Sequence, residues 1–457
     1  MKTDLRLHGG NRQILAMALP IAGSLLVPQL NFITNNIFLG GLGQRELALA
    51  GITGVYYLLF ASLGHGLHSG VQSLLSRRAG ENRPASIGLL FHQGLWLSAL
   101  MGLAGVLLTL LVAPLLLPSV MTNKADAALA VQFLQWRIWG LPLLYAYQAH
   151  NALLVGTRRS HLMIIGTASE TLCNIALDYA LIFGHWGLPA LGFKGAAVAS
   201  VLAELLGLLV AVGVVSASGL RGWLRRHQDT AVRLLWRSDD GVAAILRQSV
   251  PLILQFTVSL TSWEYFYVLV EHQGQQALAV SNTMRNIFGF VGCLTWAFAS
   301  TTNSLVSNLI GQGQVQQVLQ LTRRIALWNL LLTGTVCLLL NLAPHGVLLI
   351  YGQGEEFIGA ATPVLRVVTV AMSLMAVAVV WMNAVTGTGN TRVNLYTELV
   401  AISAYCIHVW VVLERWHLPV AWGWAAEWLY WIILLIPCYL YMRSGRWMRR
   451  LAPEPAP

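Results

Sequence analysis

Two stretches of this 457-residue chain, SGVQSLLSRRAG (69–80) and STTNSLVSNLIG (300–311), decide its fold because the second repeats the first. They lie 231 residues apart and share five of twelve residues, whereas random matching gives about one. At the same offset Pro20 falls on Pro251. The chain is therefore built from two related halves.

The composition excludes a water-soluble protein as the first interpretation. Hydrophobic residues make up 56% of the chain and charged residues 10%, with a mean hydropathy of +0.64. A soluble globular chain carries about 25% charged residues. The 28 Lys and Arg and 18 Asp and Glu would leave large apolar patches in contact with water.

Twelve apolar runs are long enough to cross a bilayer, which takes about 20 residues of helix. They cover residues 14–38, 47–76, 86–113, 127–155, 160–184, 194–218, 242–270, 277–309, 318–343, 357–386, 392–413 and 420–442. Six runs fall in each half, and an even number gives both halves the same direction through the membrane. We therefore expect an all-α integral membrane protein with twelve transmembrane helices in two parallel, pseudo-symmetric six-helix lobes.

The predicted domains follow from the repeat. They are an N-terminal lobe (1–218), a basic cytoplasmic linker (219–241), a C-terminal lobe (242–442) and a cytoplasmic tail (443–457). Two parallel bundles around a central cavity suit alternating access, in which one bundle rocks against the other. We expect a monomer in the inner (plasma) membrane.

The distribution of basic residues predicts the topology. With the N-terminus inside, 21 of the 28 Lys and Arg fall in cytoplasmic segments and 4 in outward connections. This positive-inside asymmetry places both termini in the cytoplasm. It also explains the net charge of +10 without a nucleic-acid partner.

Several kinds of site are not expected. The five cysteines all fall in predicted spans, contain no CxxC pair and suggest neither a disulfide nor a metal site. His65 and His68 lack a third ligand, and a proton-relay role is the alternative. No GxxxxGK[ST] phosphate loop is present, so we expect no cofactor, and either an ion gradient or a partner as the energy source.

Six motifs along nearly the whole chain carry a family likeness: ALPI (18–21), ITNNIFLGGLGQRELA (33–48), SRRAGEN (76–82), LLVGTRRS (153–160), NIALDYALIFGHWGLPALGFKGAAVASVLAE (174–204) and SLVSNLIGQGQ (304–314). Together they resemble the multidrug and toxic compound extrusion (MATE) family. The resemblance implies a twelve-helix antiporter that expels mostly cationic amphipathic compounds, driven by H⁺ or Na⁺. It also implies that Asn174 and Asp178, which match the family's NxxxD, belong to a first-lobe cation site.

Two positions depart from the family pattern. Where many relatives carry an aspartate in the first span, this chain has Asn35, which cannot titrate. Where another branch carries a glutamate early in the seventh span, this chain has Ser259, and the nearest acid along that span is Glu264. Both departures separate this chain from the family's usual coupling residues.

Polar residues in the first half predict an ion-coupling site. Glu170, Asn174 and Asp178 share one face of the fifth span at i, i+4 and i+8. The predicted coupling residues are Asp178, Asn174, Asn35, Ser200, Glu170 and Glu204. A buried carboxylate among them could take up a proton or ligate sodium. The alternative is a structural ion pair, since Arg137 is predicted at the same depth as Asp178.

In the second half, Glu264, Tyr265 and Arg285 are the predicted substrate-binding residues. A carboxylate beside aromatic rings would favour a cationic compound, although Tyr and Trp near a span end more often form an interfacial belt. Alternatively, Glu264 and Arg285 simply pair with each other. Arg366 and Glu427 lie at similar predicted depths and are interpreted as a structural pair.

Two other functions remain as alternatives to an antiporter. A flippase for a lipid-linked precursor shares the expected architecture, but would need a strongly cationic cavity. A polytopic membrane enzyme would need a cluster of Asp, Glu or His at a membrane surface, and no DDxxD or paired-histidine motif is present. We therefore expect a transporter and not an enzyme.

Overall fold

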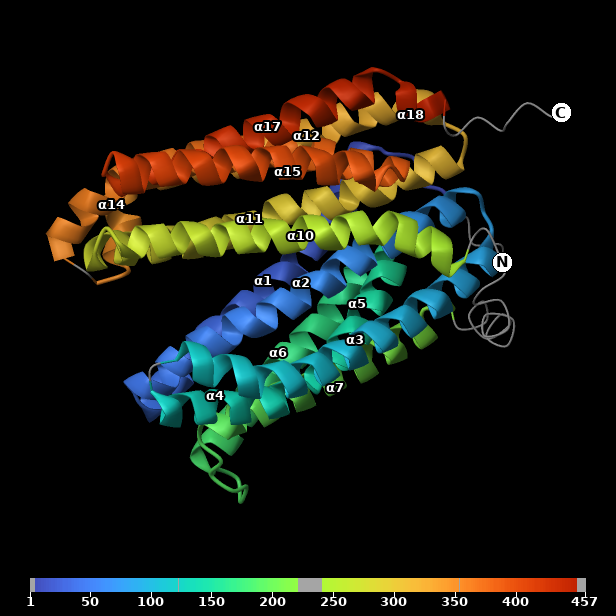
Figure 1. Cartoon of the computed structure of the whole chain (residues 1–457). Helices are drawn as coiled ribbons and strands as arrows, with labels where there is room; N and C mark the ends of the chain where they lie inside the picture. The colour runs from blue at the N-terminus through green and yellow to red at the C-terminus, as the bar shows by residue number, and fades with distance from the viewer. Residues whose placement is uncertain (1–4, 122, 221–240, 353, 450–457) are drawn as a thin grey trace. The chain divides into compact units, whose positions relative to one another are not determined.

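The computed structural model describes residues 5–121, 123–220, 241–352 and 354–449, and these form helices without a single strand (Figure 1). The predicted linker lies outside the described residues from 221 to 240, as does the predicted tail beyond residue 449. Nine of the described helices are long and apolar enough to cross a membrane.

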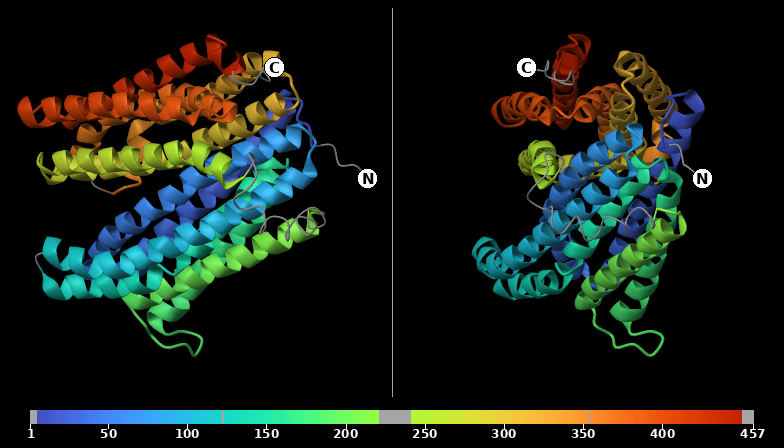
Figure 2. Two further views of the ribbon diagram at one scale, coloured as in Figure 1. Left: turned by 45° about the vertical axis from the view of Figure 1, so that its right-hand side comes forward. Right: turned by 90° about the vertical axis from the view of Figure 1, so that its right-hand side faces the viewer.

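The helices group into two compact units. Unit 1 comprises Met1–Leu5 and Gly23–Ile253, and unit 2 comprises Arg6–Ala22 and Leu254–Pro457. Within each unit the helices run alongside one another as a bundle (Figure 2). The division falls inside α1 (Asn11–Leu42) and α10 (Val242–Glu271), so each of these helices contributes to both units.

The other helices follow the predicted order. In unit 1 they are α2 (Gln44–Gly80), α3 (Pro84–Val120), α4 (Lys124–Arg137), α5 (Gly140–Gly156), the 3₁₀ turn η1 (Ser160–Leu162), α6 (Met163–Phe183) and α7 (Phe193–Ala217). In unit 2 they are α11 (Gln275–Gly311), η2 (Val315–Gln317), α12 (Val318–Leu342), α13 (Pro344–Leu349), α14 (Gly354–Thr388), α15 (Thr391–Val409), the π-helical turn η3 (Trp410–Arg415), α16 (Val420–Trp424), α17 (Ala426–Arg443) and α18 (Arg446–Arg449).

The repeat is visible in the helix boundaries. Helices α2 and α11 are both 37 residues long, and both their first and last residues are 231 positions apart. Each also holds the beginning of a helix from the opposite sequence half. Ser249 of α10 donates a hydrogen bond to the Leu67 carbonyl in α2 (2.9 Å), and the Leu7 amide donates to Asn308 Oδ1 in α11 (3.0 Å). These bonds explain why the units divide inside α1 and α10.

Two predicted spans are broken helices. The span predicted at 127–155 is interrupted at Ile138 and Trp139, between α4 and α5. Pro142 explains the break, because it cannot donate a hydrogen bond to the Ile138 carbonyl and its ring clashes there. The span predicted at 420–442 is likewise interrupted at Ala425. With each broken pair counted as one span, the described residues give the twelve predicted spans.

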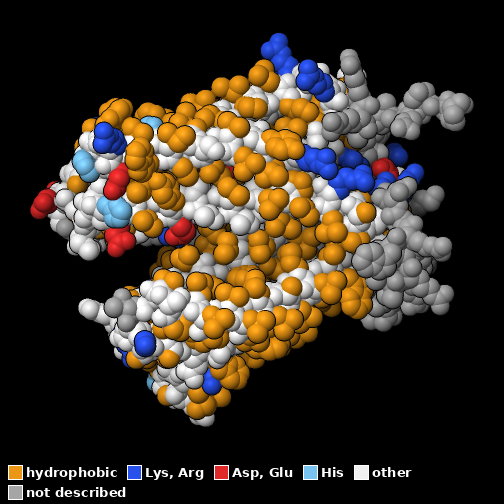
Figure 3. All heavy atoms as spheres, in the orientation of Figure 1, with side chains coloured by type: hydrophobic (Ala, Val, Ile, Leu, Met, Phe, Trp, Pro, Cys, Tyr) orange, Lys and Arg blue, Asp and Glu red, His pale blue; other side chains and the backbone are white. Residues whose placement is uncertain are grey.

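The exposed surface of the helices is apolar. Leucines such as Leu111 and Leu115 on α3 are 69% and 76% exposed. Hydrophobic side chains cover the flanks of the helices, and charged side chains gather toward the helix ends (Figure 3). This pattern suits helices that contact lipid along their length.

Candidate functional site

Helices α1 and α6 lie side by side and run in the same direction. A Cβ atom added to Gly23 would lie 3.2 Å from Ile164, and the rings of Phe38 and Tyr179 have centroids 6.3 Å apart. The members of both pairs are 141 positions apart in the sequence. The two helices therefore keep one register over four turns.

This register brings the predicted polar residues of α1 and α6 to one depth. Asn35 is level with position 176 of α6, between Asn174 and Asp178. At 1.5 Å of rise per residue, Asn35 is displaced by only about 3 Å along the helix axis from either residue. The register therefore places Asn35 at the depth of Asn174 and Asp178 within unit 1.

The side chains at this level carry oxygen atoms that have no hydrogen-bond partner. Asp178 is fully buried, and neither of its carboxylate oxygens is bonded. The Oδ1 atoms of Asn174, Asn31 and Asn35 are also buried and unbonded. Asn174 is oriented through its amide nitrogen, which donates to Ser200 Oγ of α7 at 3.5 Å. Buried oxygens without partners are rare and call for a ligand or a proton.

Arg137 neutralises a different carboxylate from the one considered in the sequence. Its guanidinium binds Glu204 of α7 through both nitrogens, at 3.0 and 2.7 Å, and lies 3.6 Å from the centre of the Tyr57 ring. Tyr57 also donates a hydrogen bond to Glu204 (3.0 Å). The alternative Arg137–Asp178 pair is therefore wrong. Glu204 is held in an ion pair, while Asp178 has no such partner.

Glycines make room for Glu170 and Glu204, the two glutamates among the predicted coupling residues. A Cβ on Gly140, the first residue of α5, would overlap the Glu204 carboxylate and the Arg137 guanidinium. Glu170 packs against Gly207 of α7, where an added Cβ would lie 2.9 Å from its carboxylate. Glu170 of α6 therefore faces α7.

The predicted pairs of unit 2 do not form. Glu264 Oε1 is buried without a partner, whereas the Arg285 guanidinium lies over the rings of Trp263 (5.6 Å) and Tyr267 (5.2 Å). The predicted Glu264–Arg285 pair is therefore wrong, because the Arg285 guanidinium packs on aromatic rings instead of binding Glu264. Tyr265, beside Glu264, is half-buried.

The Arg366–Glu427 pair is also wrong. Glu427 accepts hydrogen bonds from the indole nitrogens of Trp263 (3.1 Å) and Trp431 (3.0 Å). Residues at similar depth need not face each other, because depth along a helix does not fix the rotation of a side chain about the helix axis.

Glu398 was missed as a candidate. This glutamate of α15 is fully buried and lies four residues after the fully buried Asn394. The same Asn-x-x-x-acid spacing occurs at Asn174 and Asp178, and it was the signal that could have identified Glu398.

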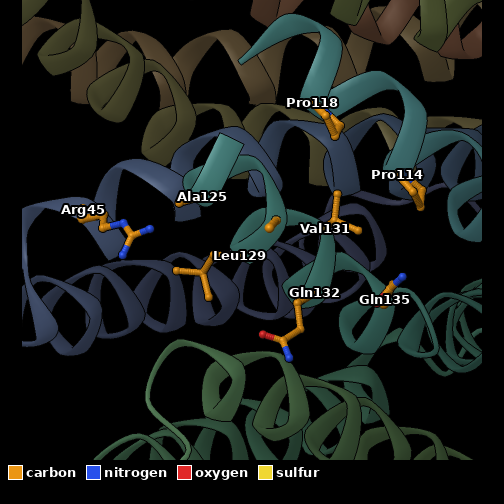
Figure 4. Close-up of a pocket in the computed structure, with 9 residues that line it drawn as sticks. Arg45, Pro114, Pro118, Ala125, Leu129, Val131, Gln132 and Gln135 are labelled. Carbon is orange, nitrogen blue, oxygen red and sulfur yellow. The ribbon is translucent and has the colours of Figure 1, made fainter. Parts of the chain in front are cut away.

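Neither the buried histidine His68 nor the pocket of unit 1 adds groups to the site around Asp178. His68 is held by the Gly64 carbonyl (2.6 Å) and Ser98 Oγ (2.9 Å). The part of the chain that the structure describes holds no group of three His, Cys, Asp or Glu residues placed to bind a metal. A shallow pocket of about 610 Å³ lies between Arg45, Pro114, Pro118 and α4, and none of the predicted site residues lines it (Figure 4).

Comparison with known proteins identifies a family. The MatE family model matches residues 20–180 and 251–411, two segments offset by the same 231 residues as the repeat. Over 219 residues the chain is 31% identical to the "Probable multidrug resistance protein NorM" of Synechocystis sp., a match that covers 46% of each chain. It is 26% identical over 405 residues to the protein of that name from Synechococcus sp., covering 85% of this chain and 84% of the relative.

Solved structures show the same fold. A MATE protein in complex with MaL6 superposes with a TM-score of 0.86 at 18% identity, over 98% of each chain. A MOP superfamily transporter from Pyrococcus furiosus gives 0.86 at 18% identity, over 99% of each chain. The curated relatives and these structures thus point to one architecture.

Proposed function

Because the chain belongs to the MatE family of multi-pass membrane transporters, which are not enzymes, we propose that it exports organic compounds in exchange for sodium ions. The names of its NorM relatives support multidrug efflux. The sodium ion would bind between α1 and α6, with Asp178 as the charged ligand. The positive-inside pattern supports cytoplasmic termini in the inner membrane.

The observation that carries the choice of sodium is the group of unbonded oxygens. One carboxylate and three amide oxygens are buried at neighbouring levels without donors. A proton would satisfy a single oxygen, whereas a hard cation is bound by several oxygens at once. With Asn35 in place of the usual aspartate and Glu204 paired with Arg137, Asp178 supplies one negative charge, which suits a monovalent cation.

The substrate we propose is a cationic amphipathic compound. Glu264 offers a buried carboxylate oxygen without a partner, and Trp263 and Tyr267 present aromatic rings beside it. The carboxylate attracts a cation through its charge, beside two rings that already hold the Arg285 cation. Bound sodium at Asp178 would favour one state of an alternating-access cycle, and its release would favour the other.

The test is ethidium efflux from energised vesicles, with the sodium and proton gradients collapsed separately. We expect collapse of the sodium gradient, or Asp178→Asn, to slow efflux by at least about tenfold, since a contact to a charged group contributes about 1.5–3 kcal/mol. Glu356→Gln, at an exposed position of α14, is the matched control. Wild-type efflux by Asp178→Asn would contradict the sodium site, and no efflux of any amphipathic cation would instead favour the flippase.

A further inference from the structure

Unit 2 contains two buried carboxylates, Glu398 and Glu427, that are not part of the sodium site proposed at Asp178. Glu398 of α15 is fully buried and Glu427 of α17 is 4% exposed. Among the described residues, neither forms an ion pair with Lys, Arg or His. A charged carboxylate inside a membrane span is costly without a cation, so each of these groups needs a ligand or a proton.

Glu398 is surrounded by neutral hydrogen-bonding groups. Its Oε1 accepts a hydrogen bond from the Tyr430 hydroxyl (2.6 Å), and its Oε2 accepts one from the Gln255 amide (3.2 Å). Ser259 is also within hydrogen-bond distance of the Tyr430 hydroxyl (3.2 Å). Gln255 is itself 4% exposed, and its Oε1 has no partner. A protonated Glu398 therefore has an acceptor within reach if the amide of Gln255 turns over.

Glu427 has a similar environment. Both of its oxygens accept from indole nitrogens, those of Trp263 and Trp431. The Arg285 guanidinium lies over the Trp263 ring at 5.6 Å and forms no ion pair with the carboxylate. The Trp263 indole thus contacts both Arg285 and Glu427, and the Glu427 carboxylate forms no ion pair with any described residue.

Two tyrosines connect the carboxylates. Tyr430 follows Glu427 by three residues on α17, which places both on one helix face, and it bonds directly to Glu398. The rings of Tyr430 and Tyr405 have centroids 6.0 Å apart, and Tyr405 lies beside Glu427. Glu398 and Glu427 are therefore close enough to influence each other's charge.

The other titratable groups around the pair are few. They are Glu264 and Tyr267 on α10, Arg285 on α11, Tyr405 on α15, and Tyr430 and Cys438 on α17. From α14 the contact to Gln255, next to Glu398, is the sulfur of Met382, which does not titrate. Arg285 is thus the one cation of this set.

We propose that Glu398 and Glu427 form a proton-binding pair in unit 2, separate from the cation site in unit 1. Each step is the addition of one H⁺ to a carboxylate to give a carboxylic acid, and its reversal on release. Neutral donors around the carboxylate oxygens stabilise the charged form of each glutamate. The Gln255 Oε1 atom, which has no partner, accepts the hydrogen bond that a protonated Glu398 donates. An inward proton gradient would then add to the sodium gradient as a driving force.

Infrared difference spectroscopy of the reconstituted full-length protein between acid and alkaline buffer tests the pair directly. We expect two carbonyl bands of buried carboxylic acids that persist in Asp178→Asn. One is lost in Glu398→Gln, the other in Glu427→Gln, and both in the double variant. Tyr430→Phe should shift the Glu398 band without removing it, and Glu356→Gln should leave both unchanged. Unchanged bands in the double variant would overturn the proposal.

Transport provides a second readout. At a fixed sodium gradient, an inward proton gradient should accelerate ethidium efflux in the wild type and not in Glu398→Gln/Glu427→Gln. Equal acceleration in both proteins would contradict the pair. Asp178→Asn separates the two sites, because it should lose sodium-driven efflux and keep both infrared bands.

Discussion

Asp178 in unit 1 and Glu398 in unit 2 are both fully buried acids that follow an asparagine by four residues, yet their surroundings differ. No donor reaches Asp178, and the nearby asparagine oxygens are also unbonded. Glu398 instead accepts hydrogen bonds from Tyr430 and Gln255. The comparison teaches that the partners of a buried carboxylate, more than its burial, indicate what it binds. Oxygens without donors suit a metal cation, whereas neutral donors hold a carboxylate that no cation pairs with and that can take up and release a proton.

Glu204 differs from both Asp178 and Glu398 because it forms an ion pair with Arg137. Removing Arg137 should have the largest effect on the stability of the protein. Arg137→Leu leaves the Glu204 charge buried and unpaired, and breaking such a pair typically destabilises by about 3–5 kcal/mol. We expect a clearly lower unfolding temperature of the purified protein in detergent. Arg137→Leu/Glu204→Leu should recover most of the loss, because replacing both charges is often neutral. A double variant as unstable as the single one would show that Glu204 needs no compensation.

Gly140→Ala should have an intermediate effect on the same pair. The added methyl group would overlap the Glu204 carboxylate, and overpacking of this kind costs about 1–3 kcal/mol. Thermal unfolding again provides the measurement. Gly213→Ala in α7 is the matched control, since nothing lies within 4 Å of the added atom there. Equal unfolding temperatures for both variants would contradict the close packing around the pair.

Asn174→Ala should have the smallest effect and bears directly on the contrast with Glu398. Loss of one neutral ligand, worth about 1 kcal/mol, should weaken sodium binding about fivefold. Titration of sodium-dependent ethidium efflux gives this affinity. Leu172→Ala, at a 68% exposed position of α6, should leave it unchanged. If the apparent sodium affinity of Asn174→Ala equals that of the wild type, Asn174 is not a ligand.

Much of the fold could be predicted from the sequence, because hydropathy and the repeat are both local signals. The offset of 231 residues holds for the boundaries of α2 and α11. The break between α4 and α5 was not predicted, although Pro142 in that span could have indicated it.

The site was predicted only in part. The shared face of Asn174 and Asp178 follows from helical spacing, and the common depth of Asn35 follows from the register of α1 and α6. The partner of Arg137 could not be predicted, because depth along a helix does not give its rotation. Only the structure shows that Glu204, and not Asp178, faces the guanidinium. Depth along the spans does not single out Glu398, whereas its spacing from Asn394, which equals that of Asp178 from Asn174, does.

The most direct measurement is equilibrium binding of radioactive sodium to the purified wild type, Asp178→Asn and Glu398→Gln/Glu427→Gln. We predict that sodium binds to the wild type and to the double variant with the same affinity and that Asp178→Asn loses it. Undiminished sodium binding by Asp178→Asn, or its loss in the double variant, would contradict the assignment of sodium to unit 1.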